Sequence, residues 1–396
     1  MIRLATACCG LLLANLAVAQ TTSKTPNAPT CLTINGQVNP ASCATGTTLL
    51  AYIQSLGASR GGVLSGQTAD PFSQNPLDVF TGSAPNWTVG SPGPQTNLTP
   101  AILNLFVQGP DNGGSPTMQT LTGSNSFVSI ANAWIAAGGI LHISMGMGNP
   151  ADPSAGGSWL ANPAIAGANG SNQINSSNSN NPWPDVLNSG TTTNKNFMAN
   201  LAQIAALLKQ INGAFLFVPW GEISNSWPPT DWYDHPQSPS QYAAMWRMTY
   251  NYLMADPGLA SKMLWGWDLG SGAQGMSAWY PGDQYVDFTA IDSISPPLGD
   301  NQGDPVATAT YNELLTHNKP MFFASVGLNY RLPSPMSGDN YQSICQQIAN
   351  SFPSAFGYVM WAQSLSLSSQ NGAVNCLSGA HMINRSNLPK FNGKNK

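Results

Sequence analysis

Eight short apolar runs recur along the chain, separated by helix-like segments or loops. Each run is almost continuously apolar, which is typical of parallel strands buried on both faces. Eight strands alternating with helices over about 330 residues predict an α/β fold, a single-domain (β/α)8 TIM barrel. The runs lie at residues 61–66, 101–107, 139–145, 214–219, 262–267, 285–291, 320–325 and 356–362.

Five segments between these runs have the pattern of helices, and several of them end in Gly or Asn, as helix stops do. The Asn-, Ser- and Gly-rich stretch 166–194 shows no periodicity and is predicted to be a long loop rather than a second domain. The predicted helices lie at residues 47–57, 127–139, 196–213, 240–256 and 340–352.

The N-terminus has the composition of an export signal. Residues 1–19 combine a single positive side chain, Arg3, with an apolar core and an Ala-Val-Ala ending. This pattern predicts a secretory signal peptide cleaved near Ala19, and therefore a secreted protein, extracellular or periplasmic. We expect three parts: the signal peptide 1–19, an extended N-terminal segment 20–45 and a (β/α)8 barrel domain 46–396.

Four cysteines remain after the predicted signal peptide, and four cysteines allow three pairings. Proximity in sequence favours Cys31 with Cys43 and Cys345 with Cys376, one disulfide near each end of the domain. A metal site is less favoured, because the chain has no Cys-x-x-Cys spacing and its histidines occur singly. The histidines are His142, His235, His317 and His381.

The charge of the chain restricts its partners. Charged residues make up only 8%, and the formal net charge is −4. Without a Lys/Arg patch to neutralise phosphates, nucleic acid is not an expected partner. No second long apolar run follows the signal, so no membrane span is expected. We expect a monomer that acts on a neutral, hydroxyl-rich polysaccharide or oligosaccharide, with no metal or organic cofactor.

Glu222 is one of only two glutamates in the chain. It lies in the run LFVPWGEISNSW at residues 216–227, where an apolar stretch ends at Pro219 and Trp220 just before the carboxylate. A strand that delivers one acid among aromatic side chains is typical of a sugar site. The run alone leaves a second interpretation open, a loop carboxylate that follows a buried strand.

The predicted barrel brings further polar residues to the same end of the fold. In a (β/α)8 barrel the carboxyl ends of the strands carry the site. Glu222 follows the fourth run, Asp268 the fifth and Asp292 the sixth, while Ser325 ends the seventh and Trp361 lies in the eighth. These side chains are therefore expected to meet at one mouth.

Four segments resemble the family 26 glycoside hydrolases, chiefly β-mannanases, in both order and spacing. They are VPWGEISNSW, DWYDHPQSPSQYAAMWR, KMLWGWDLG and AWYPGDQYVDFTAID. The resemblance covers roughly residues 60–365, and WYPGDQYVD at 279–287 is its most specific part. It implies a (β/α)8 barrel and a retaining mechanism, with the acid/base on strand four and the nucleophile on strand seven.

Carried over by position, the resemblance makes Glu222 the general acid/base, which protonates the leaving oxygen and later activates water. It also implies sugar platforms, because apolar sugar faces stack on indole rings. We interpret Trp265 and Trp246 as core residues. The implied substrate-binding residues are Trp227, Trp267, Trp361, Trp220 and Ser325.

Five positions depart from the family pattern, and all of them belong to the ring that grips the reacting sugar. Ser325 stands where the family has its nucleophilic Glu, and a serine without a neighbouring base cannot attack an anomeric carbon as a carboxylate does. The other four substitutions are Gly221 for His, Val218 for Arg, Gly146 for His and Ile294 for Tyr.

Two hypotheses survive these departures. In one, the protein is a glycosidase in which Glu222 is the acid and Asp292 or Asp268 supplies the second carboxylate. Carboxyl groups about 6.5–9.5 Å apart would then indicate inversion, and about 5–5.5 Å retention. In the other, the protein is a secreted pseudoenzyme that binds a glycan without cutting it. The sugar is open as well: β-mannan follows from the resemblance, and xylan, glucan or a shorter oligosaccharide are alternatives.

Overall fold

The computed structural model describes most of the predicted domain. The described residues are 33–34, 37–38, 46–59, 62–69, 98–108, 123–151, 181–223, 233, 238–293, 303–327, 341–361, 366–367 and 372–388. The predicted signal peptide lies outside them, as do Cys31 and Cys43. Within the segment predicted to be extended, β1 (Thr33–Ile34) and β2 (Gln37–Val38) pair antiparallel. None of the described helices is long and apolar enough to cross a membrane.

The strands form a closed parallel barrel, which confirms the predicted (β/α)8 fold. The sheet order runs from β10 through β9, β8, β7, β6, β5 and β4 to β11, and β10 also pairs with β11. Every predicted apolar run contains a strand. The strands are β3 (Val63–Leu64) with β4 (Gly66–Thr68), β5 (Ile102–Gln108), β6 (Ile140–Gly146), β7 (Phe215–Pro219), β8 (Met263–Gly270), β9 (Phe288–Ser293), β10 (Met321–Val326) and β11 (Ala355–Met360). A short strand, β12 (Met382–Ile383), pairs with β3.

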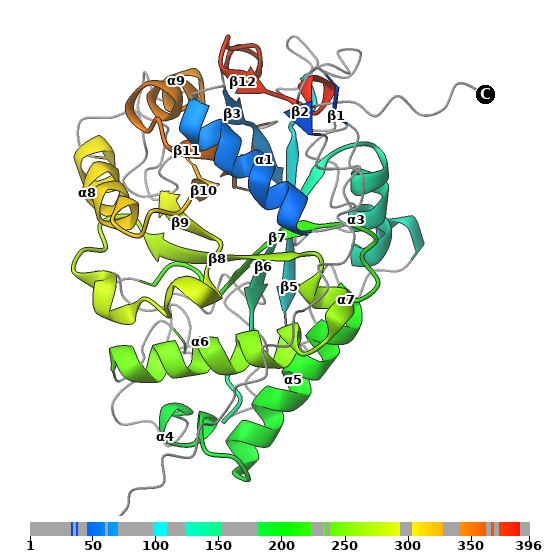
Figure 1. Ribbon diagram of the computed structural model, residues 1–396, viewed down its shortest axis with the longest axis vertical. Coiled ribbons are helices and arrows are strands. Elements are labelled where there is room, and N and C mark those ends of the chain that lie inside the picture. The colour runs from blue at the N-terminus through cyan, green and yellow to red at the C-terminus, as the bar shows by residue number, and fades with distance from the viewer. Residues whose placement is uncertain are drawn as a thin grey trace, which may run out of the picture.

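The helices lie outside the barrel (Figure 1). All five predicted helices are present: α1 (Gly46–Ser59), α3 (Phe127–Ala136), α5 (Thr192–Leu208), α6 (Pro239–Met254) and α9 (Tyr341–Ser351). Further helices are α4 (Trp183–Val186), α7 (Pro257–Ala260), α8 (Gly303–Leu315) and α10 (Ala373–Leu377). Short 3-10 helices are η4 (Gly123–Asn125), η7 (Met276–Trp279), η8 (Asp283–Tyr285) and η10 (Arg385–Asn387).

The predicted loop 166–194 is wrong over its last part. The helix α4 begins at Trp183, and α5 begins at Thr192, where the hydroxyl of Thr191 accepts the N–H of Asn194 as an N-cap. The cap satisfies a backbone donor that would otherwise be unpaired, and the buried Trp183 anchors the segment to the core. Residues 166–180 lie outside the described part of the chain.

Two apolar cores lie on the two sides of the barrel wall. The inner core contains Leu64, Ile102, Leu264 and Phe322, which point into the barrel near the amino ends of their strands. The helix α1 adds Leu49, Tyr52, Ile53 and Leu56 to the same cluster. It therefore covers the amino-terminal end of the barrel, as Figure 1 shows, and the carboxyl-terminal end lies opposite.

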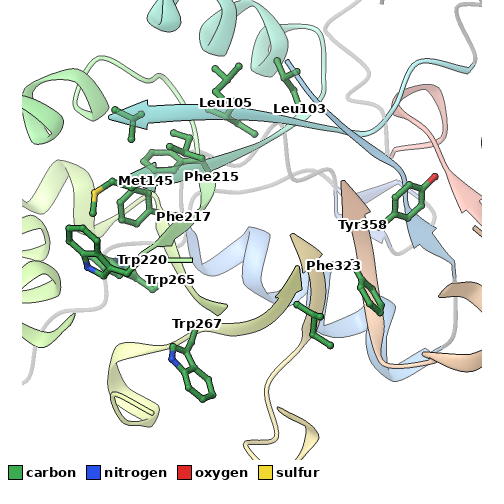
Figure 2. Close-up of a cluster of buried hydrophobic side chains, with 14 of the residues drawn as sticks. Leu103, Leu105, Met145, Phe215, Phe217, Trp220, Trp265, Trp267, Phe323 and Tyr358 are labelled. Atoms are coloured by element: carbon green, nitrogen blue, oxygen red, sulfur yellow. The ribbon is translucent and has the colours of Figure 1, made fainter. Parts of the chain in front are cut away.

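The outer core lies between the strands and the helices, and Figure 2 shows part of it. Along β8, Met263, Trp265, Trp267 and Leu269 belong to this outer core, whereas Leu264 belongs to the inner one. This alternation follows from the two-residue period of a strand. It assigns even-numbered positions of β8 to the barrel interior.

Cys345 and Cys376 lie side by side, with their Cα atoms 5.5 Å apart, within the range that a disulfide requires. Both sulfurs also contact the hydroxyl of the buried Tyr358. We expect non-reducing peptide mapping to recover Cys345 linked to Cys376. A peptide in which either residue is joined to Cys31 or Cys43 would contradict the predicted pairing.

Candidate active site

The backbone after β7 makes an unusual turn at the carboxyl end of the barrel. Trp220 and Glu222 both have positive φ, 55° and 60°, on either side of Gly221. Left-handed backbone costs a non-glycine residue roughly 1–3 kcal/mol, so it persists only where the surroundings impose it. The sheet holds the turn on both sides: Trp220 N–H donates to the carbonyl of Met145, and Gly270 N–H donates to that of Ile223.

Asp268 lies directly beneath this turn. It occupies an even-numbered position of β8, faces the barrel interior and is only 1% exposed. Its Oδ2 accepts the backbone N–H of Glu222 at 2.9 Å. A Cβ added to Gly221 would meet the same Oδ2 at 2.8 Å, closer than real Cβ contacts allow. Glycine at 221 and aspartate at 268 are therefore sterically matched.

Asp292 meets Glu222 from the other side. The two carboxyl groups share a side-chain hydrogen bond, and both residues are partly exposed. Asp292 lies on β9, which is separated from β7 by β8. The curvature of the barrel thus brings together two strand ends that are not neighbours in the sheet.

Ser325 lies beside Asp292 in the next strand. The pairing of β10 with β9 shifts between Phe323 and Ser325, so that Ser325 rather than Ala324 pairs with Asp292. The extra residue turns the Ser325 backbone toward Asp292, and the Ser325 N–H donates to the Asp292 carboxylate. Ser325 is 2% exposed, and its hydroxyl has no hydrogen-bond partner among the described residues.

Burial raises the pKa of all three carboxyl groups. The pKa of Asp268 rises to about 8, chiefly through burial and further through the charge of Glu222. Burial also raises the pKa of Asp292, and the charges of Asp268 and Glu222 add to the shift. The pKa of Glu222 is raised by burial, and its hydrogen bond with Asp292 opposes part of that shift. Interacting acids of this kind titrate as a group and can hold shared protons near neutral pH.

The raised pKa of Asp268 predicts a pH-dependent stability. Between its ordinary value of 3.8 and about 8, this carboxyl keeps its proton in the folded state and loses it in the unfolded state. The free energy of unfolding therefore falls as the pH rises through that window, by at most about 1.4 kcal/mol per pH unit. Asp268→Asn lacks this titration. We expect urea unfolding at pH 4.5, 6 and 7.5 to show that the free energy of unfolding of Asp268→Asn increases relative to that of the wild type as the pH rises. A difference in free energy that stays the same at all three pH values would contradict the raised pKa of Asp268.

The family to which the chain belongs follows from a comparison with known proteins. The family model described as "Glycosyl hydrolase family 26" matches residues 38–339. The chain belongs to glycosyl hydrolase family 26. This confirms the resemblance seen in the sequence, and the matched region contains Glu222, Asp268, Asp292 and Ser325.

Two relatives of this family 26 member are named as mannanases. A mannan endo-1,4-beta-mannosidase from Bacillus subtilis is 26% identical over 237 residues, covering 58% of this chain and 61% of the relative. The mannan endo-1,4-beta-mannosidase A and B from Caldalkalibacillus mannanilyticus is 25% identical over 216 residues, covering 52% of this chain and 40% of the relative. The chain thus spans about three fifths of the first relative's length and two fifths of the second's.

Solved structures show the same fold. A Bacillus subtilis mannanase superposes with a TM-score of 0.64 at 20% identity, covering 91% of this chain and 98% of that one. A family 26 β-mannanase from Bacteroides ovatus gives 0.62 at 17% identity, covering 88% of this chain and 98% of that one. At these identities the likeness concerns the barrel and not the substrate.

Two of the tryptophans predicted to bind sugar are instead fully buried. Trp267 projects from the outer face of β8 against Tyr280 and His317, and Trp220 stacks on Phe197. Figure 2 shows Trp220 beside Trp265 in the outer core, and Trp267 apart from that group. The sugar-platform role predicted for these two residues is therefore wrong in this structure, because an enclosed indole offers no face to a ligand. Trp265 and Trp246 are buried in the core, as predicted.

Trp361 differs from these two in being partly exposed, and its role as a sugar platform stays a prediction. It follows β11, is partly exposed, and meets Phe106 edge to face with 5.2 Å between ring centroids. Its backbone N–H donates to the carbonyl of Val326, the residue after Ser325. Trp361 thus lies at the same end of the barrel as the carboxyl groups. Trp227 and Ile294 lie outside the described residues.

One supporting residue of the site was missed in the sequence. Gln67, the middle residue of β4, donates to the carbonyl of Trp361 at 2.9 Å and accepts the N–H of Leu367 at 2.7 Å. It fixes the backbone that carries the partly exposed Trp361. Its neighbours in the sequence, LSGQTAD at residues 64–70, contain nothing that indicates a partner almost 300 residues away. Among the described residues, no group of three or more His, Cys, Asp or Glu is arranged to hold a metal ion.

Proposed function

We propose that this family 26 member is a glycoside hydrolase whose reacting groups are Glu222 and Asp292. The observation that carries the proposal is the hydrogen bond between their side chains at the carboxyl end of the barrel. Glycoside hydrolysis needs two carboxyl groups, one that gives a proton and one that is ionised. A contacting pair whose pKa values are raised by burial can keep one proton between them at neutral pH.

The contact between the two groups favours retention of configuration. Inverting enzymes keep their carboxyl groups about 6.5–9.5 Å apart to leave room for water, and retaining enzymes about 5–5.5 Å apart. A direct hydrogen bond is closer to the second arrangement. Asp292 pairs in register with Ser325, the position of the family nucleophile. In this proposal, Asp292 supplies from β9 the carboxylate that β10 lacks.

The chemistry then has two balanced steps. Glu222 gives its proton to the glycosidic oxygen as that oxygen leaves, while the Asp292 carboxylate bonds to the anomeric carbon. Glu222, now ionised, takes a proton from water, and the water oxygen replaces Asp292 at the same carbon. The sugar leaves with its original configuration, and both carboxyl groups return to their starting states.

For the substrate, we propose a secreted role on a neutral, β-mannan-like polysaccharide. The names of the two relatives support mannan, and the low charge of the chain suits a neutral polymer. The test is an assay of mannan, xylan and mixed glucans that measures release of reducing ends, followed by proton NMR of the first-formed anomer. A first-formed anomer of retained configuration supports Asp292 as nucleophile; an inverted one would contradict that role.

The second candidate function is glycan binding without cleavage. What favours it is the serine at position 325, where the resemblance to family 26 implies a nucleophilic Glu. The same assay separates the two functions when it is combined with binding isotherms. A wild-type protein that binds one of these polymers but releases no reducing ends would overturn the hydrolase proposal and support the pseudoenzyme.

The two tryptophan environments predict opposite phenotypes. Trp361→Ala should weaken polysaccharide binding by about tenfold, since it removes roughly 1–2 kcal/mol of stacking and buried area, and should leave the fold stable. Trp267→Ala should lower the free energy of unfolding by about 3–5 kcal/mol through a buried cavity, with the affinity of the folded fraction unchanged. Isothermal calorimetry and urea unfolding on both variants check this. Equal affinities for Trp361→Ala and wild type would remove Trp361 from the binding site.

A further inference from the structure

A third carboxyl group, Asp268, lies on β8, the strand between those that position the two proposed reacting groups, and neither step of the reaction uses it. We infer that Asp268 is a positioning residue: it holds the turn at residues 220–222 in the left-handed conformation that directs Glu222 at Asp292. This inference deepens the proposed function and rests on it for the role of Glu222. The orientation of Glu222 toward Asp292 can be measured without any substrate.

The first support is the hydrogen bond between Asp268 Oδ2 and the backbone N–H of Glu222, 2.9 Å long. Glu222 has φ of 60°, and two non-glycine residues of the turn share this strained conformation. An unstrained turn is available to the same residues if nothing holds the N–H. The bond from Asp268 is the side-chain contact that ties this N–H to the barrel wall.

The second support is steric. Gly221 leaves room for the Asp268 carboxyl group, and a Cβ at 221 would come within 2.8 Å of Oδ2. Asp268 is buried, and its Oδ1 has no hydrogen-bond partner among the described residues. Burying such a group is unfavourable, because a buried oxygen without a partner loses its hydration. The steric match between Gly221 and Asp268 indicates that Asp268 fixes the conformation of the turn at residues 220–222.

The third support is the position of β8 in the sheet. This strand lies between β7, which precedes Glu222, and β9, which carries Asp292. An acceptor in the interior of β8 can therefore fix the distance between the two flanking strand ends. Asp268 and Asp292 are the titratable groups that face Glu222 among the described residues.

The chain offers a clean readout, because Glu222 and Glu313 are its only glutamates. Glutamate labelled with 13C at the side-chain carboxyl gives two signals, and Glu222→Gln assigns them. Glu313 accepts the backbone N–H groups of Gly275 and Met276 on the turn that follows β8 and serves as an internal reference. The titration of the Glu222 signal then reports whether its carboxyl still lies buried against Asp292.

The experiment compares Asp268→Ala and Asp268→Asn with a matched control, Asp287→Ala. Asp287 also accepts a backbone N–H, that of Trp265 at 2.8 Å, but outside the site. In Asp268→Ala we expect the pKa of Glu222 to fall toward its ordinary value of 4.5 and the coupling with Asp292 to disappear. Asp268→Asn keeps an oxygen acceptor and should preserve a raised pKa. Asp287→Ala should leave the Glu222 titration as in wild type while lowering stability.

Activity gives a second, separate readout. Asp268→Ala should lower kcat at least tenfold with little change in KM, and Asp268→Asn should recover most of the loss. A Glu222 titration curve unchanged in Asp268→Ala, or equally changed in Asp287→Ala, would overturn the positioning role. A wild-type protein that cuts no polysaccharide would overturn the proposed function instead, and the titration would still decide whether Asp268 holds the turn.

Discussion

Glu222→Gln should abolish hydrolysis while leaving polysaccharide binding nearly intact. The amide keeps the shape of the side chain and can still hydrogen-bond to Asp292, but it cannot deliver a proton to the leaving oxygen. General acid catalysis is worth roughly 10²–10⁴ in rate, so we expect kcat to fall by about that factor. Steady-state kinetics and binding isotherms on the preferred polymer measure the two effects separately.

The matched control for this variant is Glu313→Gln. Glu313 is the only other glutamate and accepts the backbone N–H groups of Gly275 and Met276, so the variant makes the same chemical change at a residue that neither reaction step uses. We expect its kcat to equal that of wild type. If Glu222→Gln cut as fast as wild type, Glu222 would not be the acid and the assignment of the site would be wrong.

Asp292→Asn should cause a loss as large as that of Glu222→Gln, on the order of 10²–10⁴ or more in kcat. The variant retains the hydrogen bonds to Glu222 and Ser325 but has no carboxylate to attack the anomeric carbon. Because the two residues act as one unit, the double variant should be little slower than either single one. Kinetics on all three proteins measure this non-additivity.

Ser325→Ala separates the two candidates for the nucleophile. It removes a hydroxyl that has no hydrogen-bond partner among the described residues. We expect its loss of kcat to be smaller than that of Asp292→Asn by at least about tenfold. The opposite ranking, with Ser325→Ala inactive and Asp292→Asn active, would indicate that Ser325 on β10, and not Asp292 on β9, is the nucleophile.

The carboxyl pair also makes the pH profile informative. Both groups have raised pKa values, so the proton needed for the first step persists above the range of an ordinary glutamate. Activity should therefore extend to higher pH than an isolated pair of exposed carboxyl groups would allow. The apparent pKa values of the pH–activity profile belong to the pair rather than to either residue. The Asp268 variants should shift the apparent pKa values of this profile only to the extent that they change the turn at residues 220–222.

The fold followed from the sequence because its signals are local and repeated. Eight apolar runs with helical segments between them leave few alternatives to a closed parallel barrel, which is the fold observed. The match of residues 38–339 to glycosyl hydrolase family 26 is consistent with it. The candidate acid was also apparent, since Glu222 is one of two glutamates and follows the fourth run. The loop predicted at 166–194 is wrong over its last part because a capping threonine and a buried tryptophan, rather than periodicity, mark the starts of the helices there.

The direction of each tryptophan side chain could not be decided in this way. Trp267 and Asp268 are neighbours in sequence, yet one points to the helices and the other into the barrel. Strand period fixes that they differ but not which of them faces inward, because both faces of a buried parallel strand are apolar. Only the register of β8 against β7 and β9 sets the answer.

The sequence by itself determined the barrel, the end of it that carries the site and the identity of the proposed acid. The tertiary structure decided which carboxyl group meets that acid. Glu222 and Asp292 are 70 positions apart on strands that do not pair, and their contact depends on the curvature of the barrel, the left-handed turn above Asp268 and the extra residue in β10. These features arise from long-range steric and hydrogen-bond constraints, which no local pattern of residues encodes.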